Sequence, residues 1–457
     1  MKRINVLKYG ISCNTNELLT SKIQHLLDSF SYEELELYFP RGNYILSTLF
    51  LKSNVCINIS KGARILGSLN FDDFASLEKV DYPLYQDISH SYFNCSLFVA
   101  KKCSNITFKG KGCIDMQSVW DEQNKNDNVH RGAKVITLVE CKNVLIEDLS
   151  IKHATDLAVY FVSCKNVTIR NLDMNVYIDG ISPDNSKKVL IENCKVLSGD
   201  DAIVFKSSYN LNRLDECKNI TVRNCSLISR CNAIKFGTES NGGFKDVFIK
   251  NIYIKNTRMT GIAIESVDGA NIDNIQIDNV YMQNVNAPFF IHLGKRMRGP
   301  SNLSVGSISN IKISNVKAVG PYVSFKTIPW NYVSYVNKMD TQYHWNFWSA
   351  EPITPTKEIM NKPWQFTSNI CGLPRKYLRN ITLKNVYIEL AGGVKKGQYD
   401  ENVKDDFDGY PEVFVYGWTL PASGLYMRHI QNLKLHNVSF AFKRKDDREP
   451  IILNDVI

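Results

Sequence analysis

A six-residue pattern recurs along the chain. Each copy begins with a polar residue, usually Asn, continues with apolar residues at alternate positions, and ends on Asn or Asp. An early copy begins at Asn105, and the others span residues 143–148, 166–171, 188–193, 219–224, 246–251, 274–279, 310–315, 380–385 and 432–437. Such alternation is typical of a short strand with one buried face. The central copies are roughly 22 to 31 residues apart, a spacing typical of one turn of a solenoid.

The segments between the copies show no helical pattern, which excludes a fold of alternating strands and helices. They also lack the leucine and asparagine signature of leucine-rich repeats. Parallel strands stacked coil upon coil are the remaining solution. The sequence therefore predicts an all-β fold, a single-stranded right-handed parallel β-helix, as one domain over residues 1–457.

Two regions depart from the repeat. The first is an N-terminal cap over about residues 1–40, with a capping helix from Glu17 to Phe30, because a solenoid must cover its open end. The second is an insertion over about residues 320–378, which is rich in Trp and Tyr. Long loops on such a fold are often functional. These rings could stack on sugar rings, and packing against the wall explains most of them equally well.

Small residues recur at fixed places in the copies. Cys103, Cys141, Cys164 and Cys217 each come just before a first strand, so we expect an inward ladder of buried thiols. The Asn residues that end the copies should stack at a turn and satisfy turn backbone groups. The twelve cysteines form no metal-spaced cluster, which argues against a zinc site and a dense disulfide scaffold.

Three carboxylates stand out in two neighbouring copies, within Tyr177–Asp184 and Ser198–Ile203. Asp179 and Asp201 are one coil apart, so stacking would place their backbones roughly 5 Å apart. Acids that converge in this way raise one another's pKa values. Glycoside hydrolysis needs such a set, with one protonated acid and one carboxylate. The alternative is that these acids cap turns, since Asp-Gly and Gly-Asp are common turn dipeptides.

The stretch from Val176 to Ser207 resembles the core of the polygalacturonase family, glycoside hydrolase family 28. Phe39–Tyr44 and Gly110–Gly112 resemble the family's earlier coils. The resemblance implies an inverting hydrolase on a parallel β-helix without a cofactor or metal. It also implies that Asp200 is the general acid and that Asp179 and Asp201 activate water. The separation of the carboxyl groups would test inversion.

The chain departs from the family pattern at three places. Tyr177-Ile178-Asp179 stands where the family has Asn-Thr-Asp, and Cys231-Asn232-Ala233 replaces Gly-His-Gly. Ala263-Ile264-Glu265 replaces an Arg-Ile-Lys that grips a galacturonate carboxylate. An anion at this position would repel galacturonate, while Glu265 could hydrogen-bond neutral sugar hydroxyls. The departures therefore favour rhamnogalacturonan-type or decorated pectic substrates. The aromatic insertion favours a closed pocket and, with it, exo action.

The candidate substrate-binding residues are Asn232, Lys206, Glu239, Glu265, His292 and Arg296. For the individual cations around the site, a solvated surface charge is the simpler interpretation; these are Arg230, Lys235, Arg258, Arg296 and Arg298. His153 and His292 are as easily explained as structural residues.

The net charge of +9 suits an acidic polysaccharide, and we expect plant cell-wall polysaccharide or oligosaccharide as the partner. No dense Lys/Arg run predicts nucleic acid, and no apolar run is long enough to cross a membrane. The N-terminal segment lacks the apolar stretch of a signal peptide. The expectation is a cytoplasmic protein, or a secreted or periplasmic one if a signal was removed.

Two other functions remain open from the sequence. A polysaccharide lyase would share the fold, require calcium and release an unsaturated product. A non-catalytic carbohydrate-binding β-helix would bind glycan even with Asp200 replaced by Asn.

Overall fold

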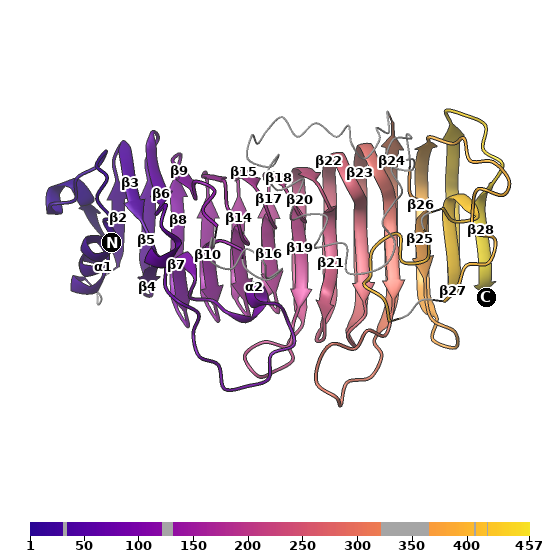
Figure 1. The fold of residues 1–457 in the computed structure, drawn as a ribbon, viewed down its shortest axis with the longest axis horizontal. Helices are drawn as coiled ribbons and strands as arrows, with labels where there is room; N and C mark the ends of the chain where they lie inside the picture. Colours follow the sequence, from indigo (N-terminus) through magenta and orange to yellow (C-terminus); the bar gives the residue numbers. More distant parts are fainter. Residues whose placement is uncertain (31–33, 121–130, 321–364, 406–407, 418) are drawn as a thin grey trace.

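The computed structural model describes residues 1–30, 34–120, 131–320, 365–405, 408–417 and 419–457. Its strands stack coil upon coil into an elongated solenoid, with the two termini at opposite ends (Figure 1). Neighbouring coils pair in parallel, as β11 (Lys142–Glu147) does with β14 (Lys165–Arg170). The chain is therefore a parallel β-helix, which confirms the fold predicted from the repeat.

The coils contribute strands to three long sheets. The first sheet contains β4 (Leu49–Leu51), β7 (Ser96–Lys101), β10 (Lys134–Val139), β13 (Val159–Val162), β16 (Ile181–Asp184), β19 (Ile203–Ser207), β21 (Asn232–Ser240), β25 (Ser368–Cys371) and β28 (Glu449–Val456). The second contains β1 (Lys2–Asn5), β2 (Leu35–Phe39), β5 (Val55–Ile59), β8 (Ser104–Gly110), β11, β14 and β17 (Lys187–Glu192). The third contains β3 (Gly42–Leu46), β6 (Ala63–Gly67), β9 (Cys113–Asp115), β12 (Ser150–Lys152), β15 (Asp173–Val176) and β18 (Lys195–Ser198).

Later strands turn the corners between sheets without a break. The second and third sheets share β20 (Cys217–Ser229), β24 (Ser307–Val319) and β26 (Leu378–Leu390). All three sheets share β22 (Gly243–Ser266), β23 (Asn271–Leu293) and β27 (Ala422–Phe442).

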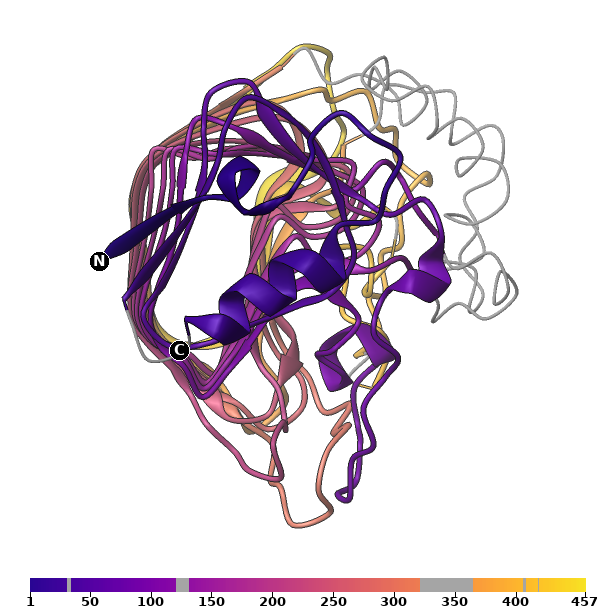
Figure 2. The same cartoon turned by 90° about the vertical axis from the view of Figure 1, so that its left-hand side faces the viewer.

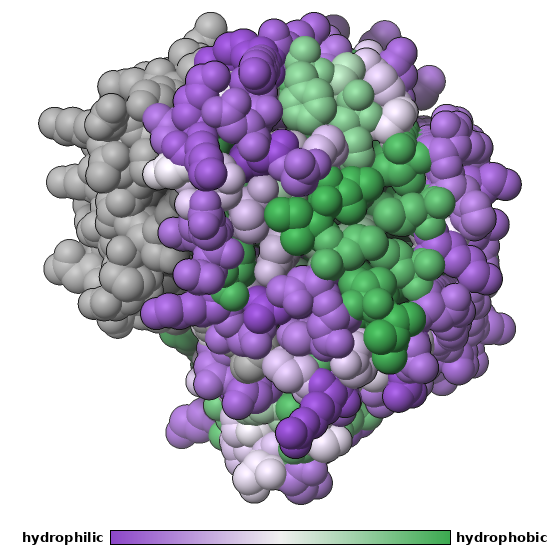
Figure 3. Space-filling model, turned by 90° about the vertical axis from the view of Figure 1, so that its right-hand side faces the viewer, coloured by the Kyte–Doolittle hydropathy of each residue, from purple (hydrophilic) through white to green (hydrophobic). Residues whose placement is uncertain are grey.

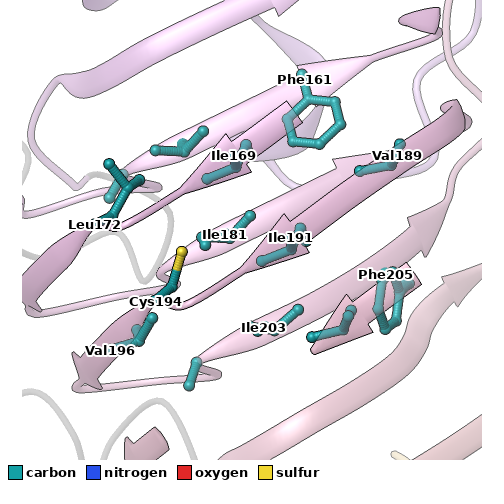
Figure 4. Close-up of a cluster of buried hydrophobic side chains, with 14 of the residues drawn as sticks. Phe161, Ile169, Leu172, Ile181, Val189, Ile191, Cys194, Val196, Ile203 and Phe205 are labelled. Carbon is teal, nitrogen blue, oxygen red and sulfur yellow. The ribbon is translucent and has the colours of Figure 1, made fainter. Parts of the chain in front are cut away.

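The apolar positions of the repeat form the core. Val144, Val167, Val189 and Ile220 occupy one register position in four successive coils, and all four are buried. Figure 4 shows inward side chains of neighbouring coils, among them the stacked pairs Ile169–Ile191 and Ile181–Ile203. Alternation within each strand thus places one apolar residue above its equivalent in the next coil.

Both expected ladders are present. Cys103, Cys141, Cys164 and Cys217 are buried, and all twelve cysteines of the chain are free thiols. The Asn ladder differs from expectation, because its amides bond to one another and not to turn backbone groups. Asn251 Nδ2 donates to Asn224 Oδ1 (3.0 Å), and Asn279 Nδ2 donates to Asn251 Oδ1 (2.8 Å). These residues have positive φ, a conformation that Asn adopts readily.

A helix covers the N-terminal opening of the solenoid. Figure 2 shows α1 (Thr20–Ser29) lying across this end, with Ile23, Leu26 and Leu27 buried beneath it. The cap also contains the 3-10 helix η1 (Val6–Tyr9). The helix begins later than the sequence predicts, because Leu18 forms a β-bridge with Ile45 instead of the first turn.

The C-terminal end of the solenoid presents an apolar face. Figure 3 shows hydrophobic residues gathered on this side of the molecule. Phe442, Leu453 and Ile457 are 39%, 51% and 67% exposed. Among the described residues, no helix lies over this end.

Four segments between strands cover the outer face of the first sheet. They are residues 68–95, with η2 (Phe71–Asp73) and α2 (Ile88–Ser91), and residues 208–216, 294–306 and 408–417. Arg298 bonds Gln86, which in turn bonds Asn241, and Asn369 Nδ2 donates to the Val413 carbonyl. Outward side chains of this sheet are consequently buried. Most of the predicted aromatic insertion, residues 321–364, lies outside the described residues.

None of the described helices combines the length and apolar character needed to span a bilayer.

Candidate active site

The three carboxylates singled out by the sequence lie together where two coils enter the first sheet. Asp179 lies just before β16, and Asp201 lies just before β19. The backbone N–H of Asp201 donates to Asp179 Oδ1 (3.1 Å). The coils approach closely because Gly199 lacks a Cβ, which would lie 1.9 Å from the Tyr177 carbonyl oxygen. A spacing of one coil therefore brings these two acids together, as the sequence predicts.

Asp200 is the most accessible of the three acids. Its side chain is partly exposed, whereas Asp179 and Asp201 are buried. Its backbone carbonyl accepts hydrogen bonds from Ser198 Oγ (2.7 Å) and Ser229 Oγ (2.6 Å). These two hydroxyls come from adjacent coils and hold the bend that carries Asp200.

The acids strongly influence one another's protonation. Burial, followed by the neighbouring Asp200 carboxylate, raises the pKa of Asp179 to about 8. Burial also raises the pKa of Asp201, and the Lys235 charge opposes this effect. Because buried acids side by side do not all ionise readily, the set retains a proton near neutral pH. A shared proton beside an ionised carboxylate is what general acid–base catalysis requires.

Asp200, Asp201 and the Cys231 thiol place possible ligand atoms within 4.8 Å of one another. Burial holds the pKa of Cys231 well above its usual range, so the sulfur remains a thiol at neutral pH. Metal ions bind the thiolate and not the thiol. The donor set fits a metal poorly, and we assign none.

A buried lysine lies among carboxylates next to the acid site. Lys235 Nζ lies 2.8 Å from Glu412, 3.7 Å from Glu265 and 3.9 Å from Asp201. The Lys235 side chain is 3% exposed, so its interpretation as a solvated surface charge was wrong. The cause is the 408–417 segment, which covers this part of the sheet and brings Glu412 to Lys235. Glu265 therefore lies beside a compensating cation.

Several buried acceptor atoms here have no hydrogen-bond partner among the described residues. They are Asn232 Oδ1, both Glu265 oxygens and Glu412 Oε2. Asn232 uses its backbone N–H and Nδ2 to donate to Asp201 Oδ1, both at 3.0 Å. An unpaired buried acceptor costs about 1–3 kcal/mol. The arrangement therefore suits a ligand that offers hydroxyl donors.

A second charged group lies at the far end of the same strands. Lys206 Nζ donates to Glu239 Oε2 (2.7 Å), and Arg298 donates to Glu239 Oε1 (2.5 Å). Burial opposes ionisation of Glu239, but Lys206 and the nearby cations hold its pKa well below the usual range. Lys206 also lowers the pKa of Asp179 through its charge. Lys206 and Glu239 thus belong to the electrostatic surroundings of the acids.

Arg296 and His292 make contacts within the protein, although Arg296 Nη1 and His292 Nε2 are buried without a hydrogen-bond partner among the described residues. Arg296 pairs with Asp268 and donates to the Thr238 carbonyl (3.1 Å). His292 is fully buried, with Nδ1 3.0 Å from the Tyr416 hydroxyl. Burial lowers the pKa of His292 to about 3, so it is neutral.

His153 pairs with a neighbouring acid, and Arg230 is buried. His153 Nδ1 lies 2.8 Å from Asp115 Oδ1, a structural pair on the third sheet's side. Arg230 is 6% exposed, so for this residue too the interpretation as a solvated charge was wrong.

Sequence reasoning missed two residues beside the acids. Glu412 lies outside the repeat, so no spacing rule connects it with Lys235. His90 lies on α2, where its Nδ1 is 2.6 Å from Asp87 Oδ1 and its buried Nε2 has no partner among the described residues. The His90 charge lowers the pKa of Asp179, which places the imidazole in the same electrostatic set. For Lys235, alternation with the inward Ile234 and Phe236 indicated an outward side chain. For Glu412 and His90 the repeat gave no such indication.

Comparison with known proteins agrees with this architecture. The profile described as Glycosyl hydrolases family 28 matches residues 33–324. The chain is similar to the Exo-poly-alpha-D-galacturonosidase of Dickeya chrysanthemi, with 23% identity over 299 residues, 54% of this chain and 49% of that protein. The chain thus spans about half, or less, of the length of the curated relatives it matches.

Two solved structures share the fold. The hyperthermoactive exopolygalacturonase from Thermotoga maritima superposes with a TM-score of 0.65 at 18% identity, covering 85% of this chain and 87% of that one. The family 28 exopolygalacturonase from Yersinia enterocolitica gives a TM-score of 0.67 at 16% identity, covering 100% and 77%.

Proposed function

The chain belongs to family 28 of the glycosyl hydrolases, and from this premise we propose that it hydrolyses O-glycosidic bonds in a pectic polysaccharide or oligosaccharide. One observation carries the proposal: Asp179, Asp200 and Asp201 lie together at the start of the first-sheet strands, where burial raises the pKa of Asp179 to about 8. Glycoside hydrolysis needs a proton donor for the leaving oxygen and a carboxylate that activates water.

We assign the acid role to Asp200 and the activation of water to Asp179 and Asp201. Support for Asp200 comes from its greater exposure, which lets it reach a substrate oxygen. Burial favours the proton on Asp179 in the free protein. In a coupled set the protons redistribute as nearby charges change, so this proton remains available to Asp200.

Inversion of the anomeric centre is proposed from the family alone. One oxygen of Asp200 and one of Asp201 lie within 4.8 Å, which is closer than the roughly 6.5–9.5 Å typical of inverting pairs. The anomer of freshly released product, followed by NMR, tests this step. The same anomer as in the substrate would mean retention.

A neutral sugar beside the acids is the substrate feature we favour. Asp201, Glu265 and Glu412 all lie within 4 Å of Lys235, so the described groups around this lysine are mainly acidic. The unpaired oxygens of Glu265 and Glu412 suit hydroxyl donors and disfavour a uronate carboxylate. Rhamnogalacturonan-type or decorated pectic fragments fit this pattern better than plain homogalacturonan.

Exo action is proposed from the covering of the sheet. Residues 408–417 lie over the first sheet on the C-terminal side of the acids, where Asn369 and Lys235 bond to them. A cover on one side of the acids suits removal of terminal units. Two of the similar structures are named exopolygalacturonases.

The test is a product screen on homogalacturonan, rhamnogalacturonan oligosaccharides and enzymatically trimmed pectin fragments. Wild type is compared with Asp200→Asn and with Asp148→Asn as a matched control. Asp148 accepts from Asn171 in the turn ladder, where other coils carry Asn, so its replacement keeps the fold and leaves the acids untouched.

We expect new reducing ends from rhamnose-containing or decorated substrates, abolished by Asp200→Asn and retained by the control. Activity on homogalacturonan alone would refute the neutral-sugar subsite and keep the hydrolase. Unsaturated, calcium-dependent products would identify a lyase. Glycan binding without cleavage in all three proteins would identify a binding protein.

A further inference from the structure

A lysine occupies the same position in five successive coils. Lys142, Lys165, Lys187, Lys218 and Lys245 pair with one another in register from coil to coil. We call these five residues the lysine ladder. Adjacent parallel strands lie about 4.8 Å apart, so the ladder runs about 19 Å along the solenoid axis.

The ladder stands at the corner where the chain leaves the first sheet for the second. Lys187 comes three residues after Asp184, the last residue of β16. The coils that carry Asp179 and Asp201 thus also carry Lys187 and Lys218, at the opposite end of the first-sheet strands. The ladder is separate from the acids but lies on the same coils.

The ladder is only partly neutralised. Lys187 lies 3.2 Å from Asp215, Lys218 lies 3.9 Å from Glu216, and Lys245 lies 3.9 Å from Asp273. The side chains of these three lysines remain 40%, 35% and 45% exposed.

Two ladder lysines, Lys142 and Lys165, are exposed and make no ion pair with any residue that the structure describes. Like charges in a row repel one another, so an uncompensated row is costly without an anionic partner.

A hollow lies against the middle of the ladder. Its volume is about 590 Å³, within the range of ligand pockets. Lys165, Lys187 and Lys218 line it, together with Lys188, the residue that follows Lys187 in β17. Asp215 and Glu216 also line it, which leaves an excess of positive charge.

We propose that the lysine ladder binds an acidic polysaccharide laid along the solenoid axis, at a site separate from the acids. One cation per coil matches a polymer that carries a carboxylate on successive sugars. The proposal rests on the proposed function, because a pectic substrate supplies such a polymer. The ladder would hold a uronate-rich part of the polysaccharide while a neutral linkage of the same polysaccharide meets the acids.

The composition of the hollow favours a polysaccharide over nucleic acid. Single-stranded nucleic acids are held by a basic groove together with aromatic rings that stack on the bases. The described residues that line the hollow include no aromatic ring; besides the charged groups they are Leu214, Asn219 and Gly242.

The test measures binding of polygalacturonate by affinity electrophoresis, in an Asp200→Asn background that prevents cleavage. The ladder variant combines Lys142→Gln, Lys165→Gln and Lys188→Asn. These three lysines are exposed and make no ion pair with the described part of the chain, and Asn is the residue that other coils carry at position 188. The control variant combines Lys250→Gln, Lys312→Gln and Lys384→Gln, which are exposed outside the ladder position and remove the same charge.

We expect the ladder variant to lose affinity for the polymer by at least about tenfold, since exposed ion pairs each contribute modestly. The control should bind like the parent, and binding should weaken with added salt. In the Asp200-containing proteins, cleavage of short oligosaccharides should stay unchanged in both variants.

Equal affinity of ladder and control variants would overturn the proposal, whether binding persists in both or falls in both. Tighter binding of an oligonucleotide than of polygalacturonate would also overturn it. Binding of polygalacturonate together with no cleavage of any substrate by the wild type, which keeps Asp200, would leave the ladder standing and refute the hydrolase. The two proposals therefore fail separately.

Discussion

Lys235 and Glu412 lie 2.8 Å apart although 177 residues separate them in the chain. Lys235 belongs to the coil next to that of Asp201, and Glu412 belongs to the segment that covers the first sheet. The pair ties this covering segment to the acid site. It also explains why a lysine that points out of the sheet is buried and not solvated.

The lysine should matter more for stability than either glutamate beside it. Lys235→Met leaves Asp201, Glu265 and Glu412 without their common cation, and breaking a buried pair in this way costs about 3–5 kcal/mol. Glu412→Gln still leaves Lys235 two carboxylates within 4 Å, so it should cost about 1 kcal/mol. Urea unfolding at pH 7 measures the difference.

The contrast between these two variants should shrink at acidic pH, because burial raises the pKa values of Asp201, Glu265 and Glu412 and their protonation removes the repulsion. If the difference in unfolding free energy between the two variants is the same at pH 7 and pH 5, packing and not charge dominates.

Asp179 should make the folded state less stable as pH rises. Its pKa is about 8 in the folded protein and about 3.9 when unfolded. Between these values the folded state binds more protons, so the free energy of unfolding falls with increasing pH. Asp179→Asn should therefore raise this free energy at pH 8 by at least about 1 kcal/mol and leave it nearly unchanged at pH 4. Denaturant titrations at both pH values provide the measurement.

The same proton predicts the alkaline side of the activity profile. Raising the pH through about 8 removes the proton held by the acid set, so kcat/KM should fall in this range. A profile that stays flat to pH 9 would contradict a proton shared among Asp179, Asp200 and Asp201.

Glu265 should control which sugar is accepted. Glu265→Lys would place two lysines against Asp201 and Glu412, which balances the charges and creates a cation for a uronate. We expect the ratio of kcat/KM on oligogalacturonate to that on rhamnose-containing fragments to rise about tenfold or more. Glu265→Gln is the isosteric control and should lower repulsion without creating the cation. An unchanged ratio in the lysine variant would place the neutral-sugar subsite elsewhere.

The inward stack of isoleucines should dominate the stability of the central coils. Ile191 is fully buried and pairs in register with Ile169. Ile191→Ala should lower the free energy of unfolding by about 2–5 kcal/mol. Thr168→Ala, at a partly exposed position on the opposite face of a neighbouring strand, should cost much less. Both are measured by urea denaturation.

The sequence was sufficient for those features that repeat. A fixed coil length determines which residues stack, because strands one turn apart pair in parallel at one spacing. The core positions, the Cys and Asn ladders and the closeness of Asp179 to Asp201 all follow from this rule. The capping helix was recognisable for a similar local reason, since its apolar residues recur at helical spacing.

Only the tertiary structure decided what covers the outer face of the first sheet. Alternation shows that Lys235, Glu265 and His292 point outward, but it does not distinguish an open face from a covered one. That depends on the path of non-repeating segments such as residues 408–417, which are set by contacts distant in sequence. Burial in turn decides the charges: the same Asp179 that would ionise near pH 4 in water holds its proton to about pH 8 in this site.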